Sequence, residues 1–197
     1  DIIFTDGHDY GATQNAISKY QNAITIIDAG RVTPELLELC KYIKYIVCSK
    51  GFAETVTGLK FDFSNPSSLV AVYNKLQDKY PNSNIVITLE ENGCLYTSGN
   101  EIKIMPGLKI QAVDTTGAGD IFHGAFTYGI ANNFDMEKII TLSNIAAGLS
   151  VTKIGARLSV PNLSEVLDYY SKKMNNQVNG QTNIPVDNNQ GNMPNAN

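Results

Sequence analysis

The sequence predicts an α/β fold, a three-layer sandwich in which helices cover both faces of a mostly parallel central sheet. Two observations predict it. Short apolar runs recur along the chain, and segments with apolar residues at helical spacing separate most of them. The runs are continuous rather than alternating, which favours strands buried on both faces. Strands that alternate with helices are typical of parallel sheets covered on both sides.

Four apolar runs predict buried strands, and two further runs predict a hairpin beside them. Asp6-Gly7 stops the first run, which begins at the start of the chain, and Asp28-Ala29-Gly30 closes the second. Glu91-Asn92-Gly93 makes a tight turn before the hairpin. The predicted strands span residues 2–5, 24–27, 45–48, 85–89, 94–97 and 102–105.

Capping residues and apolar spacing predict the helices. Thr33-Pro34-Glu35 supplies an N-cap, a proline at the first helical position and an acid in the first turn. Ser64-Asn65-Pro66 starts another helix, which ends before Pro81. The predicted helices span residues 10–20, 33–41, 52–56, 64–80, 136–153 and 163–170, besides one that follows residue 117.

Composition divides the chain into one domain and a tail. The 197 residues, 43% of them hydrophobic, suit a single globular domain. Residues 173–197 are rich in Asn and Gln and contain few apolar side chains. Because such a segment cannot bury enough surface to offset its ordering entropy, we expect a disordered tail there and a folded domain over residues 1–172.

Charge and cysteine usage exclude several classes of protein. The net charge is −4 and no basic block occurs, which argues against nucleic acid as a partner. No apolar run approaches the roughly 18 residues of a membrane span, and no signal peptide is visible, so no membrane partner is predicted. Cys40, Cys48 and Cys94 are odd in number and lack C-x-x-C spacing, which favours a reducing compartment and therefore the cytoplasm.

The stretch 114–126, Asp-Thr-Thr-Gly-Ala-Gly-Asp-Ile-Phe-His-Gly-Ala-Phe, predicts a helix start that binds an anion. Gly117, Ala118 and Gly119 are small, so a ligand can approach backbone N–H groups that have no partner within the helix. The helix dipole adds about half a positive charge there, which attracts phosphate. Asp120 would repel phosphate, which favours a role as a base. The alternative is a Gly-rich turn in which Asp120 merely caps the helix.

This stretch fits neither of two familiar nucleotide-binding motifs. A Walker A loop is excluded because the chain has no G-x-x-x-x-G-K-[ST]. Gly117, Gly119 and Gly124 do not fit the dinucleotide fingerprint G-x-G-x-x-G. The stretch closely resembles the C-terminal signature of the ribokinase-like (PfkB) family of carbohydrate and nucleoside kinases. The resemblance covers residues 2 to about 167.

The resemblance implies a ribokinase-like fold and the ATP-dependent phosphorylation of a hydroxymethyl group on a sugar. Asp120 would be the catalytic base, next to the acceptor hydroxyl. The amides of Gly117, Ala118, Gly119 and Asp120 would form an anion hole for the transferring phosphoryl group, and Mg²⁺ would bridge the ATP phosphates.

Two further segments resemble nucleotide-binding parts of the family. The string Thr-Leu-Glu-Glu-Asn-Gly at 88–93 is similar to a Thr-Leu-Gly-x-x-Gly turn that lies along the nucleotide. Thr88 and Gly93 match this turn, whereas Glu90 replaces a glycine and places an acid beside polyphosphate. Asn144 stands where the family has a nucleotide-contacting Asn or His; its alternative is a polar residue on a helix surface.

A monovalent cation site, taken to be for potassium, is also implied. In many members such an ion is held mainly by backbone carbonyls, which replace its hydration shell. The alternative is an ordinary loop in which Gly155 ends a helix. The positions that match the cation segment are Asp114, Thr116, Ser150, Lys153, Gly155 and Ser159.

The clearest departure from the family pattern lies at residues 49–54. Many members carry Asn-x-x-Glu here, which helps to place magnesium and phosphate, but this chain has Ser49 and Phe52 at those positions. Glu54 could substitute only in a different helix register. The string Cys-Ser-Lys-Gly-Phe-Ala-Glu is similar to the version in some ketose-directed members, which hints at a ketose.

His8 and His123 are the only histidines, and His123 follows Asp120 by three residues. We interpret His123 as a structural or pocket-lining residue rather than a base. Arg31 follows a strand end and either reaches a phosphate or is a solvated loop residue.

The family holds its sugar with an N-terminal Gly-Gly motif and a small β lid, and nothing in this chain resembles them. The sequence is therefore expected to be the C-terminal part of a kinase, with the nucleotide half and the base but without the N-terminal part and lid. Alone it should be inactive and poorly soluble or oligomeric; the complete protein could form a homodimer. The alternatives are a nucleoside kinase and a non-catalytic module that binds nucleotide or another subunit.

Overall fold

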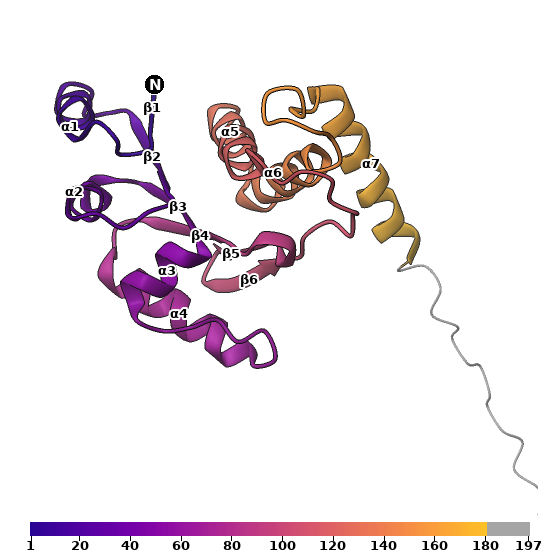
Figure 1. Cartoon of the computed structure of the whole chain (residues 1–197), viewed down its shortest axis with the longest axis horizontal. Helices are drawn as coiled ribbons and strands as arrows, with labels where there is room; N and C mark the ends of the chain where they lie inside the picture. The colour runs from indigo at the N-terminus through magenta and orange to yellow at the C-terminus, as the bar shows by residue number, and fades with distance from the viewer. Residues whose placement is uncertain (181–197) are drawn as a thin grey trace, which may run out of the picture.

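The computed structural model describes residues 1–180, with side chains described as far as Asn175. Its centre is a six-stranded sheet whose strands follow one another in chain order. The first four strands are parallel, and the last two run antiparallel to their neighbours as a hairpin. The strands are β1 (Ile2–Thr5), β2 (Ile24–Ala29), β3 (Tyr45–Ser49), β4 (Asn84–Thr88), β5 (Cys94–Ser98) and β6 (Glu101–Met105). Figure 1 shows the sheet between two groups of helices, which confirms the predicted α/β sandwich.

One face of the sheet carries the helices that connect the parallel strands. Each begins at a side-chain cap: Asp9, Thr33, Ser49 and Asn65 accept hydrogen bonds from N–H groups of the first turn. The helices are α1 (Tyr10–Lys19), α2 (Pro34–Leu39), α3 (Lys50–Thr57) and α4 (Pro66–Lys79). Their apolar faces pack on β2, β3 and β4 in one hydrophobic core, in which Leu36, Phe52 and Tyr73 are almost fully buried.

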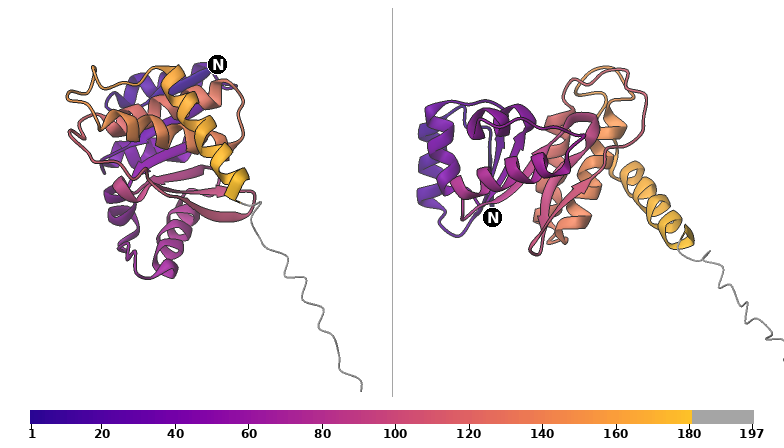
Figure 2. Two further views of the ribbon diagram at one scale, coloured as in Figure 1. Left: turned by 90° about the vertical axis from the view of Figure 1, so that its right-hand side faces the viewer. Right: turned by 90° about the horizontal axis from the view of Figure 1, so that it is seen from below.

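The opposite face is covered by α5 (Ala118–Ala131) and α6 (Met136–Ser150). A second core forms there between the sheet and the two helices, around Val47, Tyr96 and Phe126. Helix α7 (Leu163–Gly180) packs on α6 through Val166 and forms no layer of its own on the sheet. The right view of Figure 2 shows the two groups of helices on opposite sides of the strands.

The main differences from the sequence-based boundaries lie at helix ends. Helix α6 ends at Ser150 rather than near Lys153, because turns follow Ser150. Helix α7 continues to Gly180, well beyond the predicted end at Tyr170 and into the predicted tail. Lys and Met favour helix, and Lys173 Nζ lies 3.7 Å from Met105 Sδ on β6, which ties this part of the helix to the hairpin. The rest of the predicted tail, 181–197, lies outside the described residues.

Between Asp1 and Gly180, no helix combines the length and the apolar character that crossing a membrane requires.

Candidate active site

The start of helix α5 is built from glycine for a geometric reason. Gly117 is its N-cap residue and has a left-handed backbone, with φ of 79°. A Cβ at this position would lie 2.7 Å from Cβ of Ala156, so the segment that follows α6 presses directly on the loop. Both facts favour glycine at 117. The fold therefore fixes how the chain enters α5.

Three backbone N–H groups at this helix start are free to bind an anion. Within residues 1–180, the N–H groups of Gly117, Gly119 and Asp120 donate to no protein acceptor, as expected around the first turn of a helix. Ala118 differs, because its N–H donates to the carbonyl of Thr115 over 3.2 Å. Of the four predicted amides, those of Gly117, Gly119 and Asp120 thus remain for a ligand, and only that of Ala118 is engaged within the chain.

A cleft of about 580 Å³ opens beside these donors. Gly119 and Ala118 form part of its wall, and an added Cβ at Gly119 would meet no atom within 4 Å. The volume suits a ligand of nucleotide size. The other lining residues are Thr88, Glu90, Glu91, Gly93, Gly107, Leu108, Ile110, Ala112, Thr115, Phe122, Asn144, Ala147, Gly148 and Val151.

Four of the five residues predicted to bind nucleotide, Thr88, Gly93, Gly119 and Asn144, line this cleft, whereas Gly117 lines a second pocket on the other side of the α5 start. Thr88 ends β4, and its hydroxyl donates to the carbonyl of Cys48 over 3.3 Å. Gly93 has φ of 92°, and a Cβ there would lie 1.9 Å from the Met105 carbonyl oxygen, so only glycine lets the hairpin close. Asn144 is buried rather than on a helix surface; its Nδ2 donates to the carbonyl of Met105 over 3.3 Å and so supports the chain leaving β6.

Two glycines of the cleft were missed by the reading of the sequence. Gly107 lies so close to the turn before β5 that a Cβ would be 2.2 Å from the Glu91 carbonyl oxygen. A Cβ at Gly148 would be 2.6 Å from a Leu108 methyl group. The Pro-Gly pair at 106–107 indicates a turn and could have pointed to Gly107. Gly148 is a lone glycine inside a helix, and such a glycine does not indicate which residue packs against it.

Acidic Glu90 stands at the rim of the cleft in an unusual conformation. Its φ is 58°, in the left-handed region that glycine adopts more readily than other residues. Its carboxylate is largely exposed and lies 4.0 Å from Nζ of Lys50, at the start of α3. Lys50 therefore offsets part of the negative charge at the rim.

The segment that departs from the family pattern has structural roles in this chain. Ser49 caps α3, accepting from the Phe52 N–H over 3.1 Å, and Phe52 itself is buried in the core. Glu54 accepts from Lys60 Nζ over 2.8 Å and from the Phe61 N–H over 3.1 Å. These bonds lower the pKa of Glu54. Glu54 therefore braces the loop after α3, and its carboxylate is engaged there.

Asp114 joins the two segments predicted to surround a cation. Its carboxylate accepts from the Thr116 N–H over 2.9 Å and from the Gly155 N–H over 2.8 Å. The bond from Gly155, followed by those from Thr116, lowers the pKa of Asp114 to about 2. The side chains of the other predicted residues do not contact the Asp114 carboxylate. Lys153 Nζ lies 3.5 Å from Glu165, and the hydroxyls of Ser150 and Ser159 donate to nearby backbone carbonyls.

Asp120 and His123 occupy different environments on α5. Asp120 is exposed, whereas the ring of His123 is buried against the sheet near Asp28 of β2. His8 and Arg31 pair with each other at the carboxyl ends of β1 and β2, where His8 also contacts Asp6 over 2.6 Å. Within residues 1–180, no cluster of three or more His, Cys, Asp or Glu side chains is arranged to hold a metal ion.

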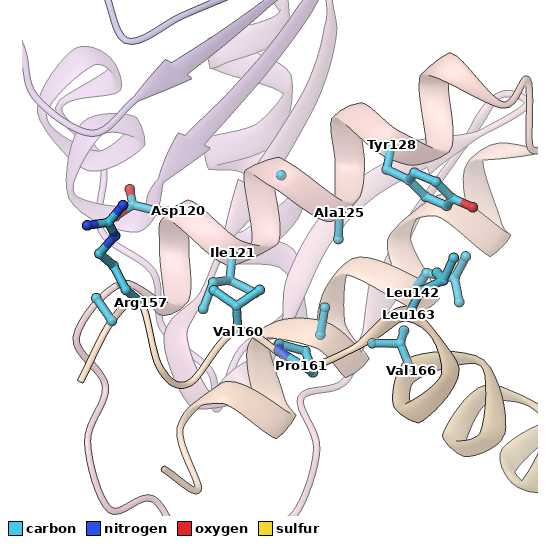
Figure 3. Close-up of a pocket in the computed structure, with 14 residues that line it drawn as sticks. Asp120, Ile121, Ala125, Tyr128, Leu142, Arg157, Val160, Pro161, Leu163 and Val166 are labelled. Atoms are coloured by element: carbon cyan, nitrogen blue, oxygen red, sulfur yellow. The ribbon is translucent and has the colours of Figure 1, made fainter. Parts of the chain in front are cut away.

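A second, mostly apolar pocket of about 530 Å³ lies on the other side of the α5 start. It runs between α5, α6 and the segment that leads into α7. Figure 3 shows Asp120 and Arg157 at one end of this pocket, with their charged groups turned toward each other, and Ile121, Val160 and Val166 further along it. The carboxylate of Asp120 is thus accessible beside the cleft and beside this pocket.

Comparison with known proteins finds relatives of the chain among sugar kinases. The profile described as "pfkB family carbohydrate kinase" matches residues 9–163. The chain is 31% identical over 157 residues to the ribokinase of Lactococcus lactis, covering 78% of this chain and 48% of that protein. It is 32% identical over 143 residues to the deoxyribokinase of Salmonella typhi, covering 70% and 45%.

A solved structure gives the same picture of the fold. The crystal structure of the ribokinase from Thermotoga maritima matches with a TM-score of 0.70 at 28% identity, covering 87% of this chain and 57% of that one. The chain spans about half the length of the curated relatives that it matches.

Proposed function

The chain belongs to the pfkB family of carbohydrate kinases, and from this membership we propose that residues 1–172 bind ATP and carry the general base for phosphorylating a hydroxymethyl group of a sugar. The observation that carries the proposal is the start of α5. Unpartnered N–H groups of Gly119 and Asp120 meet a cleft of nucleotide size there, and an exposed carboxylate stands beside them. An anion site next to a base is what phosphoryl transfer needs.

In the proposed mechanism the protein acts mainly by position and charge. ATP, bound with Mg²⁺, supplies the phosphoryl group. The N–H groups of Gly119 and Asp120 bind its oxygens, helped by the positive end of the α5 dipole. The carboxylate of Asp120 accepts the proton of the attacking hydroxyl. Because residues 1–180 offer no cluster of metal ligands, Mg²⁺ would be held largely by phosphate oxygens and water.

A monovalent cation would act from behind the same loop. Asp114 already ties the chain before α5 to Gly155, so these two segments are held together where carbonyl groups could surround an ion. Such an ion would brace the start of α5. We propose potassium as this ion, on the basis of the family resemblance. Asp114 would shape the site through the backbone N–H groups that it binds. Lys153 would lie outside the site, since its Nζ lies near Glu165.

The acceptor is proposed to be a sugar. The relatives named ribokinase and deoxyribokinase favour a pentose, whereas the local string at 48–54 resembles ketose-directed members. A nucleoside is the alternative acceptor within the family. A panel of ribose, deoxyribose, ketoses and nucleosides, each assayed for ADP release at saturating ATP, separates these classes.

A non-catalytic nucleotide-binding module is a second candidate, and one observation favours it. The positions of the family's Asn-x-x-Glu are taken by a helix cap, Ser49, and by a core residue, Phe52. Glu54 is engaged elsewhere. On this hypothesis the chain binds ATP but transfers phosphate to no acceptor of the panel.

The base is tested by Asp120→Asn in any form of the protein that shows turnover. Loss of a general base should lower turnover by about 10²- to 10⁴-fold, while ATP affinity changes little because the amide keeps the size of the side chain. Asp78→Asn, an exposed acid on α4, is the matched control. Near-normal turnover in Asp120→Asn would remove the carboxylate from the mechanism.

A further inference from the structure

The ring of His123 lies beneath the start of α5 with only 5% of its side chain exposed. It stands one helical turn after Gly119 and faces the carboxyl ends of β2 and β3. The ring centroids of Phe4 and Phe122 lie 6.3 and 6.1 Å from that of His123. A polar ring in this place needs partners for both nitrogens.

Both ring nitrogens of His123 face backbone carbonyl oxygens. Nδ1 lies 2.6 Å from the carbonyl oxygen of Gly119, and Nε2 lies 3.2 Å from that of Val47. A carbonyl oxygen only accepts hydrogen bonds, so each nitrogen must carry a hydrogen to be satisfied. The ring that meets both conditions is the imidazolium cation. The carboxylate of Asp28, with Oδ1 3.4 Å from Nε2, is placed to balance its charge.

The orientation of the Gly119 carbonyl matters because it determines where the Asp120 N–H points. This carbonyl and the N–H of Asp120 belong to one peptide unit, which is planar and trans, so the N–H points away from the carbonyl. Within α5 this carbonyl also accepts the backbone N–H of His123, as helix geometry requires. The ring adds a second hydrogen bond to the carbonyl and so further restrains the direction of the Asp120 N–H, which has no protein acceptor within residues 1–180.

We propose that protonated His123, balanced by Asp28, is a positioning residue that orients the Gly119–Asp120 peptide unit toward the phosphoryl group of the nucleotide. For its effect on nucleotide, this role rests on the proposed function; the protonation of the ring does not. The positive charge of the ring also lies below a helix start that is to receive an anion, so it adds to the attraction of the helix dipole.

The charged neighbours of the pair come from three elements. Asp28 belongs to β2, Asp120 to α5, and Asp6 follows β1; β3 contributes the uncharged carbonyl of Val47. Burial raises the pKa of Asp28, the His123 charge opposes this, and the carboxylates of Asp120 and Asp6 raise it further. A cation at 123 thus stands among carboxylates on several sides.

The state of the ring is measured directly by ¹⁵N NMR of the labelled 197-residue chain, without nucleotide. The inference expects both His123 ring nitrogens to carry a proton at neutral pH, while exposed His8 serves as the internal reference. In Asp28→Asn the ring should become neutral, with its remaining proton on Nδ1. A neutral ring in the parent chain would overturn the inference, because one ring nitrogen would then face a carbonyl oxygen without a hydrogen to donate.

A pair of variants tests the effect on phosphate. His123→Asn keeps an N–H donor near the position of Nδ1, whereas His123→Gln carries its donor near that of Nε2. Titrations with ATP and with AMP, which lacks the outer phosphates, separate phosphate positioning from binding of the base and ribose. His123→Gln should bind ATP roughly tenfold more weakly with AMP affinity unchanged, as when an outer-shell partner is lost, and His123→Asn should bind ATP within about threefold of the parent chain.

The other outcomes are equally decisive. Equal ATP affinity in both variants, or a parallel loss of ATP and AMP affinity, would overturn the positioning role. A cooperative thermal transition in each variant excludes misfolding as the cause. If the parent chain binds neither nucleotide, the proposed function fails, and the NMR experiment still decides whether His123 is an imidazolium held by Asp28.

Discussion

A single methyl group at Gly119 should change stability and nucleotide affinity in opposite directions. Gly119 lies in the first turn of α5 with a helical backbone, and an added Cβ would meet no atom within 4 Å. Gly119→Ala therefore introduces no strain and removes the excess freedom of glycine in the unfolded chain. The expected gain is about 0.5–1 kcal/mol, which raises Tm by about 1–4 °C in a chain of this length.

The same methyl group would stand in the wall of the cleft, next to the N–H that is proposed to bind phosphate. A phosphate moved outward by about 1 Å loses its aligned contacts, and displacements of that size cost up to about 10² in rate at reaction centres. We expect ATP affinity to fall at least tenfold, equivalent to about 1.4 kcal/mol. Differential scanning fluorimetry and isothermal titration calorimetry on the same preparation measure the two effects.

Gly124→Ala is the matched control for this change. Gly124 lies on the same helix, is exposed, and would also meet no atom within 4 Å as alanine, but it does not line the cleft. It should show the same gain in Tm with unchanged ATP affinity. Unchanged ATP affinity in Gly119→Ala, or an equal loss in Gly124→Ala, would refute the placement of phosphate at the start of α5.

Three other changes probe the loop before α5. The pKa of Asp114 is lowered from 3.8 to about 2 in the folded chain, so its contribution to stability is complete above about pH 4 and is lost as pH falls through 2; Tm should drop more steeply between pH 5 and 2 than in Asp114→Asn. Gly117→Ala should destabilise the chain by about 1–3 kcal/mol in urea unfolding, because φ is 79° and the methyl group would clash with Ala156. Replacing a bulky organic cation by potassium at constant ionic strength should raise turnover or, where turnover is absent, tighten ATP binding; a flat response contradicts the cation site.

The sheet was predictable because its signals are local. Runs such as the one that became β3 are continuously apolar, and a strand buried between two helical layers needs that composition. Helix caps such as Thr33 and Asn65 could be predicted from the sequence, because the capping side chain and the N–H that donates to it lie within three residues of each other. The length of α7 was not readable, since its contact with Met105 joins residues far apart in the sequence.

The site was predictable to the extent that it depends on one continuous stretch. Residues 117–120 form the start of α5 as expected, because small residues and a helical pattern adjoin there. The Ala118 N–H bonds to the Thr115 carbonyl, and the His123 ring contacts the Gly119 carbonyl. Both interactions depend on the directions in which these carbonyls point. No pattern of residue types specifies a carbonyl direction, so these features required coordinates.

The acid at the rim of the cleft illustrates how a departure from the family pattern is accommodated. Glu90 has a left-handed backbone, at a cost of about 1–2 kcal/mol. Its carboxylate stays in solvent and lies 4.0 Å from Lys50. An exposed pair of this kind contributes about 0–1 kcal/mol to stability, so it does not offset the backbone cost. Its consequence is electrostatic: Lys50 places a positive charge beside the negative charge of Glu90 at the rim, and it stands next to Ser49, where the family resemblance would place an asparagine. The replacement of glycine by Glu90 and the presence of Lys50 are therefore best understood as one change in the charge of the rim.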